Sequence, residues 1–142
     1  MDRRLVIGSV GGGRRVLIVD DDAGIRLLLV TFLRRHGYQM RQARNGREAL
    51  AEMRAGNADL VVTDLTMAEV SGWEVLRVRA ADRSLLRIPV IVITAINQNM
   101  AAESVAGRSV SAVLGKPFDL DTLLAAVESS FDETNIPAPL AA

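Results

Sequence analysis

The sequence predicts an α/β domain in which helices cover both faces of one parallel sheet. Five short strand-like runs alternate along the chain with runs of helical period, and this alternation is typical of repeated β-α units. Several of the short runs are apolar on both faces, as strands in a parallel sheet are when helices cover both sides. Right-handed crossover connections leave few ways to arrange five such units.

Five short stretches are predicted to be strands, namely residues 15–20, 38–43, 58–64, 88–95 and 110–118. The stretch IPVIVITA at residues 88–95 is the most strand-like because it is almost entirely aliphatic and β-branched. The stretch YQMRQA at residues 38–43 carries polar side chains, so we expect an exposed edge strand there.

Five stretches of helical period are predicted to be helices, namely residues 23–37, 46–56, 71–82, 97–109 and 119–131. The first should bury a face made of Ile25, Leu28, Leu29, Phe32 and Leu33. The last should begin after an N-cap at Asp119 and bury Leu120, Leu123, Leu124, Val127 and Phe131. Residues 97–109 lack an apolar stripe, so we expect a short or mobile helix at residues 98–106.

The chain has the length of one ordinary domain, 142 residues. Residues 1–13 end in three glycines and are expected to be a flexible leader, the folded domain should span residues 14–131, and the proline-containing residues 132–142 should be a disordered tail or a linker stub. The longest apolar run is about half of the roughly 20 residues that a membrane-spanning helix needs. We therefore expect a cytoplasmic protein.

The composition excludes several classes of function. Seventeen basic residues balance 17 acidic ones, whereas a dedicated nucleic-acid-binding domain normally has a basic excess. The absence of cysteine excludes disulfides and cysteine-ligated zinc, and a single histidine, His36, excludes a histidine metal cluster. We interpret His36 as a surface residue near a helix end.

Polar residues follow the predicted strands, and they share a chemical theme. They are Asp20, Asp21 and Asp22 after the first strand, Asp64 after the third, Thr94 after the fourth, and Lys116 with Pro117 after the fifth. The carboxyl ends of parallel strands lie at one edge of a sheet, so these groups should converge. Carboxylates around a hard cation such as Mg²⁺, with a hydroxyl and an ammonium beside them, indicate phosphoryl transfer with an aspartate nucleophile.

Four segments, VLIVDD, LVVTD, VIVITA and LGKPF, together resemble the receiver domain of two-component response regulators. The resemblance covers residues 14–131, and the anchors are separated by 43 residues from Asp21 to Asp64, 30 to Thr94 and 22 to Lys116. It implies a flavodoxin-like fold with a five-stranded parallel sheet in the order 2-1-3-4-5.

The resemblance also implies a metal site and a phosphoacceptor. Asp64 matches the residue that accepts the phosphoryl group in this family. Asp20 and Asp21 match the acidic pair that holds Mg²⁺ together with Asp64, and the backbone carbonyl of Thr66 matches a further ligand. Mn²⁺ can substitute for Mg²⁺. Asp22 stands where the first helix begins, so we interpret it as a helix cap.

The remaining positions concern the phosphoryl group and the switch. Thr94 matches the switch hydroxyl and Lys116 the lysine that pairs with the phosphoryl group, and the Lys116–Pro117 peptide bond is often cis in the family. Val113 occupies a position where the family usually has an aromatic residue, so the aromatic half of the switch is absent. Ile96, two residues after Thr94, cannot orient an attacking water, which predicts slow autodephosphorylation.

The implied partners are a histidine kinase or a histidine phosphotransfer protein as donor and an unidentified downstream protein, with no nucleic acid and no membrane. The chain would be a signalling domain rather than an enzyme, a monomer or weak dimer, with at most weak self-phosphorylation and autodephosphorylation. Val113 and Ala68, the latter in place of a usual proline, leave open a pseudo-receiver that acts as a phosphorylation-independent scaffold. An aspartate-dependent phosphohydrolase and an input domain cut from a longer regulator are further alternatives.

Overall fold

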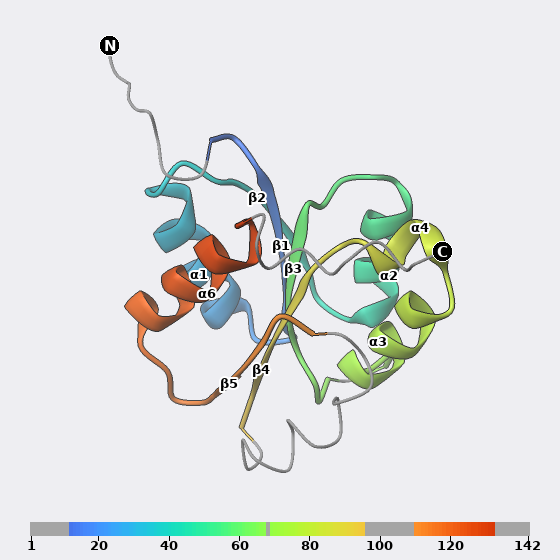
Figure 1. Cartoon of the computed structure of the whole chain (residues 1–142). Helices are drawn as coiled ribbons and strands as arrows, with labels where there is room; N and C mark the ends of the chain where they lie inside the picture. The colour runs from blue at the N-terminus through green and yellow to red at the C-terminus, as the bar shows by residue number, and fades with distance from the viewer. Residues whose placement is uncertain (1–11, 68, 96–109, 133–142) are drawn as a thin grey trace.

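The structure of the chain is a computed structural model that describes residues 12–67, 69–95 and 110–132. Five parallel strands form one sheet in the order β2-β1-β3-β4-β5, which confirms the predicted fold class and strand order (Figure 1). The strands are β1 (Arg15–Val19), β2 (Gln39–Ala43), β3 (Leu60–Asp64), β4 (Val90–Thr94) and β5 (Ala112–Gly115).

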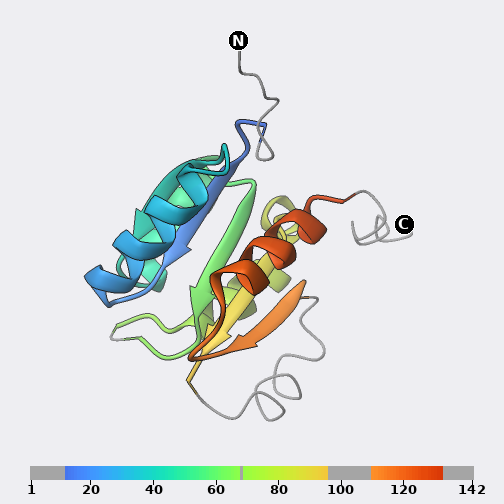
Figure 2. The same ribbon diagram turned by 90° about the vertical axis from the view of Figure 1, so that its left-hand side faces the viewer.

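The described helices are α1 (Ala23–Arg34), α2 (Gly46–Arg54), α3 (Gly72–Ala80), α4 (Arg83–Leu86) and α6 (Leu120–Ser130). Helices α1 and α6 cover one face of the sheet, and α2, α3 and α4 cover the other (Figures 1 and 2). The four-residue helix α4 was not predicted, because four residues are too few to show an apolar period. The helix expected at residues 97–109, the leader up to residue 11 and the tail from residue 133 lie outside the described residues.

Successive strand residues face opposite sides of the sheet and so fill two separate core layers. Val61 and Val92 pack with the layer under α2, α3 and α4, whereas Val62 and Ile93 pack with the layer under α1 and α6. All five residues of β3 and of β4 are buried, as expected for central strands of a parallel sheet. β2 lies at one edge with Gln39, Arg41 and Gln42 exposed, which confirms the edge strand.

Helix α1 buries Leu29, Val30 and Leu33, but the prediction that Leu28 is buried was wrong. Leu27 and Leu28 are 64% and 52% exposed. Residues 27–30 are four consecutive aliphatic residues, which spread over all sides of a helix, so the apolar period alone did not identify the two that face the core.

The two predicted helix caps differ. The Asp22 carboxylate accepts hydrogen bonds from the backbone N–H groups of Gly24 at 2.8 Å and Ile25 at 3.1 Å, so Asp22 is the N-cap of α1 as predicted. Asp119 stands at the N-cap position of α6, but its side chain makes no capping hydrogen bond. Within the described ranges, no helix has both the length and the apolar character needed to cross a bilayer.

Candidate functional site

The carboxyl ends of β1, β3, β4 and β5 bring the predicted polar residues to one edge of the sheet. Asp20 directly follows β1, while Asp64 and Thr94 are the last residues of β3 and β4. The strands run in register, with Asp64 opposite Ile93 and Thr94 opposite Gly115. The backbone N–H of Lys116 donates to the carbonyl oxygen of Thr94 at 2.8 Å, which brings the start of the Lys116 side chain to this edge.

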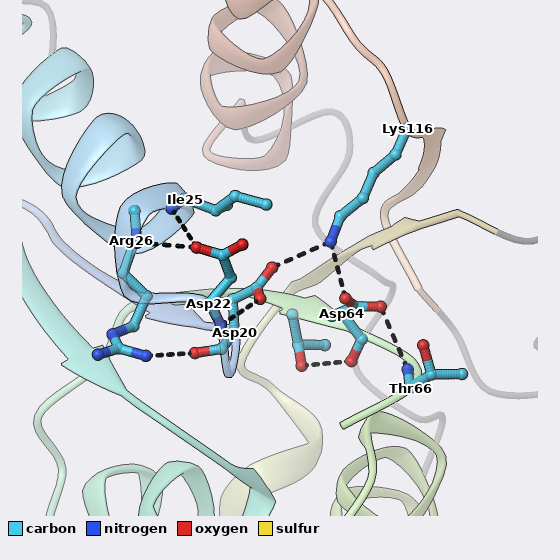
Figure 3. A network of polar contacts seen from close by, with 9 residues as sticks. Asp20, Asp22, Ile25, Arg26, Asp64, Thr66 and Lys116 are labelled. Atoms are coloured by element: carbon cyan, nitrogen blue, oxygen red, sulfur yellow. Dashed lines mark hydrogen bonds and ion pairs between the residues drawn. The ribbon is translucent and has the colours of Figure 1, made fainter. Parts of the chain in front are cut away.

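The ammonium of Lys116 is the centre of the site. Its Nζ lies 2.8 Å from Oδ2 of Asp64 and 3.1 Å from Oδ2 of Asp20, and it donates a hydrogen bond to each (Figure 3). The side chains of Asp20 and Asp64 are 6% and 8% exposed, and that of Lys116 is 20% exposed. The structure therefore brings Lys116 together with Asp20 and Asp64, which lie 96 and 52 positions before it in the sequence.

Two carboxylates share one ammonium, so the site carries more negative than positive charge. Burial raises the pKa of Asp20 above its usual value, the nearby Asp64 charge adds to the rise, and the Asp22 N–H and Lys116 offset only part of it. For Lys116, burial alone would lower the pKa, but its hydrogen bonds to Asp64 and Asp20 and their charges outweigh burial and raise it. These contacts thus favour the charged form of Lys116, while burial favours the neutral form of Asp20.

Backbone groups fix the two carboxylates in place. The N–H of Asp22 donates to Oδ1 of Asp20 at 2.9 Å, and the N–H of Thr66 donates to Oδ1 of Asp64 at 3.2 Å (Figure 3). Each carboxylate therefore points one oxygen toward Lys116 and the other toward its own following loop.

Helix α3 begins against the backbone of Asp64. The N–H of Gly72 donates to the carbonyl oxygen of Leu65 at 3.0 Å. A Cβ added to Gly72 would lie 2.1 Å from the carbonyl oxygen of Asp64, so any other residue would push α3 away from the site. Trp73 follows at once and packs against the core layer under α2, α3 and α4.

The other predicted residues surround this centre. Asp21 and Thr66 are exposed on the loops that follow β1 and β3. Val113 is half-buried in β5 and packs against the layer under α2, α3 and α4. The Lys116–Pro117 peptide bond is cis. Ala68 and Ile96 lie outside the described residues.

The donor chemistry of the site fits a hard cation. Asp20 and Asp64 offer buried carboxylate oxygens, and Mg²⁺ prefers oxygen ligands and needs only one or two carboxylates because it keeps several waters. Among the described residues, no group of three aspartate, glutamate, histidine or cysteine side chains is arranged to hold a metal ion. The fit of the site to Mg²⁺ therefore depends on the Asp20–Asp64 pair, and Asp21 is exposed on the loop next to Asp20.

Sequence reasoning missed one residue of this network, Arg26 of α1. Its Nη1 donates to the carbonyl oxygen of Asp20 at 2.7 Å, and its Nε donates to the side-chain oxygen of Gln42 in β2 at 3.1 Å (Figure 3 shows the first contact). The available signal was an arginine one helical turn after the cap Asp22.

Comparison with known proteins identifies the family. The model of the response regulator receiver domain matches residues 16–128. The chain belongs to this family. Receiver domains are signalling domains of two-component systems. These domains bind Mg²⁺ for phosphorylation and interact with histidine kinases and downstream effectors.

The bacterial relatives fall into two groups, according to how much of their own length the match covers. It is 32% identical over 122 residues to the chemotaxis protein CheY of Pseudomonas aeruginosa, covering 85% of this chain and 98% of that protein. It is 36% identical over 112 residues to the CAI-1 autoinducer sensor kinase/phosphatase CqsS of Vibrio cholerae, covering 78% of this chain but 16% of that protein. The match covers 25% of the DNA-binding transcriptional regulator NtrC of Rhizobium meliloti, at 35% identity and with 85% of this chain.

Solved receiver structures have the same fold. The chemotaxis response regulator CheY4 of Vibrio cholerae superposes with a TM-score of 0.76 at 26% identity, covering 82% of this chain and 98% of that chain. The response regulator TrrA of Thermotoga maritima, solved in complex with Mg²⁺-BeF, superposes with a TM-score of 0.72 at 33% identity, covering 82% of this chain and 97% of that chain.

Proposed function

We propose that this receiver domain accepts a phosphoryl group on Asp64 from a histidine kinase or a histidine phosphotransfer protein. Phosphorylation would then change the binding of a downstream protein, or the phosphoryl group would be passed on in a relay. The observation that carries the proposal is the Lys116 ammonium, which lies within 2.8 Å of Asp64 and 3.1 Å of Asp20 at the carboxyl edge of the sheet.

The chemistry assigned to Asp64 is nucleophilic. A carboxylate oxygen of Asp64 would attack the phosphorus of a phosphohistidine, forming the O–P bond as the N–P bond breaks and the imidazole leaves with the electron pair. Two hydrogen bonds hold the carboxylate, one from Lys116 and one from the Thr66 N–H. Each carboxylate oxygen still has a lone pair that is not engaged by these donors, so the group remains available for attack.

Lys116 and Thr94 would hold the product. The charged ammonium already lies against Asp64, so it can pair with a phosphoryl oxygen after transfer. Thr94 is buried at the end of β4 beside Lys116, and we assign it the hydrogen bond from the switch hydroxyl to the same phosphoryl group. Val113 of β5 has no aromatic ring to rotate, so backbone shifts after β4 would carry the change outward.

Mg²⁺, or Mn²⁺ in its place, would be held by Asp20 and Asp64, with Asp21 and the Thr66 carbonyl as further ligands. When bound, the ion supplies positive charge that offsets the negative charge of the transferring phosphoryl group. The excess negative charge of the Asp20–Asp64 pair supports this assignment. So does the 33% identity to TrrA, whose structure contains Mg²⁺-BeF.

The test is to treat the metal-free chain with Mg²⁺ and beryllofluoride, or with a small-molecule phosphodonor, and to record Trp73 fluorescence and the intact mass. We expect a Mg²⁺-dependent fluorescence change and a hydroxylamine-labile phosphoryl adduct, both lost in Asp64→Asn. Asp59→Asn, at the opposite end of the sheet, is the matched control and should keep both responses.

A chain that gives neither the fluorescence change nor the adduct would instead support the pseudo-receiver, a scaffold that binds partners without phosphorylation. A fluorescence change that persists in Asp64→Asn would also contradict the proposal, because the response would then come from another site.

A further inference from the structure

The backbone of Asp20 is held from two sides by groups outside its own loop. Its N–H donates to the carbonyl oxygen of Ala43 at the end of β2, at 3.2 Å. Its carbonyl oxygen accepts a hydrogen bond from Nη1 of Arg26 at 2.7 Å. Its carboxylate accepts from the Asp22 N–H and from Lys116. Every polar group of this buried residue therefore has a partner, and one of these partners, Arg26, belongs to no predicted site.

Arg26 is itself anchored. It lies in the second turn of α1, whose start is fixed by the Asp22 cap, and its own N–H donates to the carbonyl oxygen of Asp22 at 3.0 Å. The guanidinium spans from Asp20 to Gln42 of β2, which its Nε reaches at 3.1 Å. Because the guanidinium is planar and rigid, bonds at both Nη1 and Nε restrict how it can turn.

The consequence concerns the peptide unit between Asp20 and Asp21. The carbonyl of Asp20 and the N–H of Asp21 belong to the same planar group, so a bond that orients this carbonyl also fixes the direction in which Asp21 leaves the strand. Without Arg26, the partly buried carbonyl would need a new donor, and rotating this peptide unit toward solvent would displace both aspartates.

We propose that Arg26 is a positioning residue for Mg²⁺ binding, because it sets the orientation of the Asp20–Asp21 peptide unit and thereby the arrangement of both aspartates. The inference rests on the proposed function, since it takes Mg²⁺ as the ligand of this site. Arg26 does not contact the ion in this proposal; it acts through the backbone of the residues that do.

The charge of Arg26 alone predicts the opposite change in Mg²⁺ affinity, so the direction of that change tests the proposal. Removing a positive charge near a cation site should strengthen Mg²⁺ binding, whereas removing a positioning residue should weaken it. For Arg26→Gln we expect the Mg²⁺ dissociation constant to rise roughly threefold to tenfold, which is at or below the roughly tenfold minimum typical of side chains that orient metal ligands directly, because Arg26 acts through the backbone. Arg26→Lys keeps one donor and should lie between the wild type and Arg26→Gln.

The experiment is an NMR titration of the metal-free chain with MgCl₂ alone, following the backbone amides of residues 20–22 and 64–66. Arg34→Gln is the matched control, because it makes the same charge change on the exposed end of the same helix and should leave the dissociation constant unchanged. Gln42→Leu removes the second anchor of Arg26 and should weaken Mg²⁺ binding less than Arg26→Gln. In the absence of metal, the Asp22 amide signal should move in Arg26→Gln and not in Arg34→Gln.

The two proposals fail differently. If the wild type binds Mg²⁺ and Arg26→Gln binds it equally or more tightly, the role of Arg26 is wrong and the proposed function stands. If the wild type does not bind Mg²⁺ at all, both are overturned. Should Arg26→Gln unfold, Arg26→Lys and Gln42→Leu decide, and unchanged affinity in both would overturn the role.

Discussion

Each end of the sheet holds a cationic side chain that is partly or fully buried, but the partners of the two cations differ. At the carboxyl end, Lys116 is shared by the carboxylates of Asp20 and Asp64. At the amino end, before β4 begins, Arg79 of α3 is fully buried and donates to the carbonyl oxygens of Ile88 at 2.8 Å and Leu86 at 3.2 Å. Backbone carbonyls are permanent partners, whereas carboxylates can exchange an ammonium for another cation.

A second cationic side chain at the amino end, Arg15, also has its partners within the fold. Arg15 donates to both carboxylate oxygens of Asp59, at 3.0 and 3.2 Å, and to the carbonyl oxygen of Gly56. One cation thus meets one carboxylate there, while at the carboxyl end one cation meets two. Burial of charge alone therefore does not mark the functional end of the sheet; two carboxylates around a single cation do.

The largest expected effect is at the amino end. Arg79→Met keeps the side-chain stem but leaves two partly buried carbonyl oxygens without these donors, at about 1–3 kcal/mol each, so we expect the free energy of unfolding to fall by about 2–6 kcal/mol. Urea unfolding measures this loss. Arg83→Met on the exposed surface of α4 is the control and should change little. Mg²⁺ should stabilise Arg79→Met and the wild type equally; an unequal gain would show that the two ends are not independent.

Lys116→Met should have a smaller effect that depends on metal. In the absence of Mg²⁺ we expect a loss of about 1–3 kcal/mol, between the values for exposed and buried ion pairs, because the Lys116 side chain is 20% exposed. Mg²⁺ should then raise the free energy of unfolding of this variant more than that of the wild type, because two carboxylates are left without a cation. Urea unfolding with and without Mg²⁺ measures this rise in each protein. If Mg²⁺ stabilises Lys116→Met and the wild type equally, the interpretation that two carboxylates share one cation at this end is wrong.

The sequence was enough to predict the fold and the convergence of Asp20, Asp64 and Lys116. Alternating apolar strands and helices determine the layers, and in a parallel sheet the residues after each strand must meet at one edge. The order of the strands came from the resemblance to receiver domains, because periodicity does not specify which strands are neighbours.

The arginines could not be predicted in the same way. Arg26 and Arg79 both donate to backbone carbonyl oxygens, and a carbonyl acceptor leaves no mark in the sequence. An arginine in an amphipathic helix is usually exposed to solvent. The apolar period of the helix therefore does not show when a guanidinium is buried. Leu28 shows the same limit for apolar residues, since four consecutive aliphatic residues fit more than one orientation of α1.

Asp59→Asn should show how the ion pair at the amino end depends on pH. The hydrogen bonds and charge of Arg15 lower the pKa of Asp59, so the unfolded chain binds more protons at this group as the pH falls. The contribution of Asp59 to the free energy of unfolding is therefore fully present above its pKa in the unfolded chain, about 4. This contribution is lost as the pH falls through the lower pKa of Asp59 in the folded chain. Because the Asp59 side chain is 38% exposed, we expect a loss of only about 0.5 kcal/mol at pH 7.

The measurement is urea unfolding of the wild type and Asp59→Asn at pH 7 and at steps down to about pH 3, where carboxylates are largely protonated. The difference between the two proteins should shrink toward the acid end. A difference that stays constant with pH would mean that the Arg15–Asp59 contact stabilises the fold by packing and not by charge.

Effects of similarly small size concern backbone strain, which also differs between the two ends. Glu69, in the loop between β3 and α3, has a φ of 63°, in the left-handed region that residues with a Cβ adopt at a cost. After α2, near the amino end, Gly56 occupies the same region with a φ of 76°. The loop beside Asp64 therefore keeps a strained residue where the other end uses glycine.

Glu69→Gly should raise the free energy of unfolding by about 0.5–1 kcal/mol, because the strain is relieved and only part of the gain is lost to the greater freedom of the unfolded chain. The reciprocal change, Gly56→Ala, should lower it by a similar amount. Among the described residues, no atom beyond the neighbours of Gly56 in the chain lies within 4 Å of the added Cβ, so the loss would be conformational. Urea unfolding of both variants measures the pair. If Glu69→Gly is instead destabilising, the contacts of Glu69 with Asn45 at 3.4 Å and Arg47 at 3.9 Å outweigh the strain, and those side chains hold the loop beside Asp64 in place.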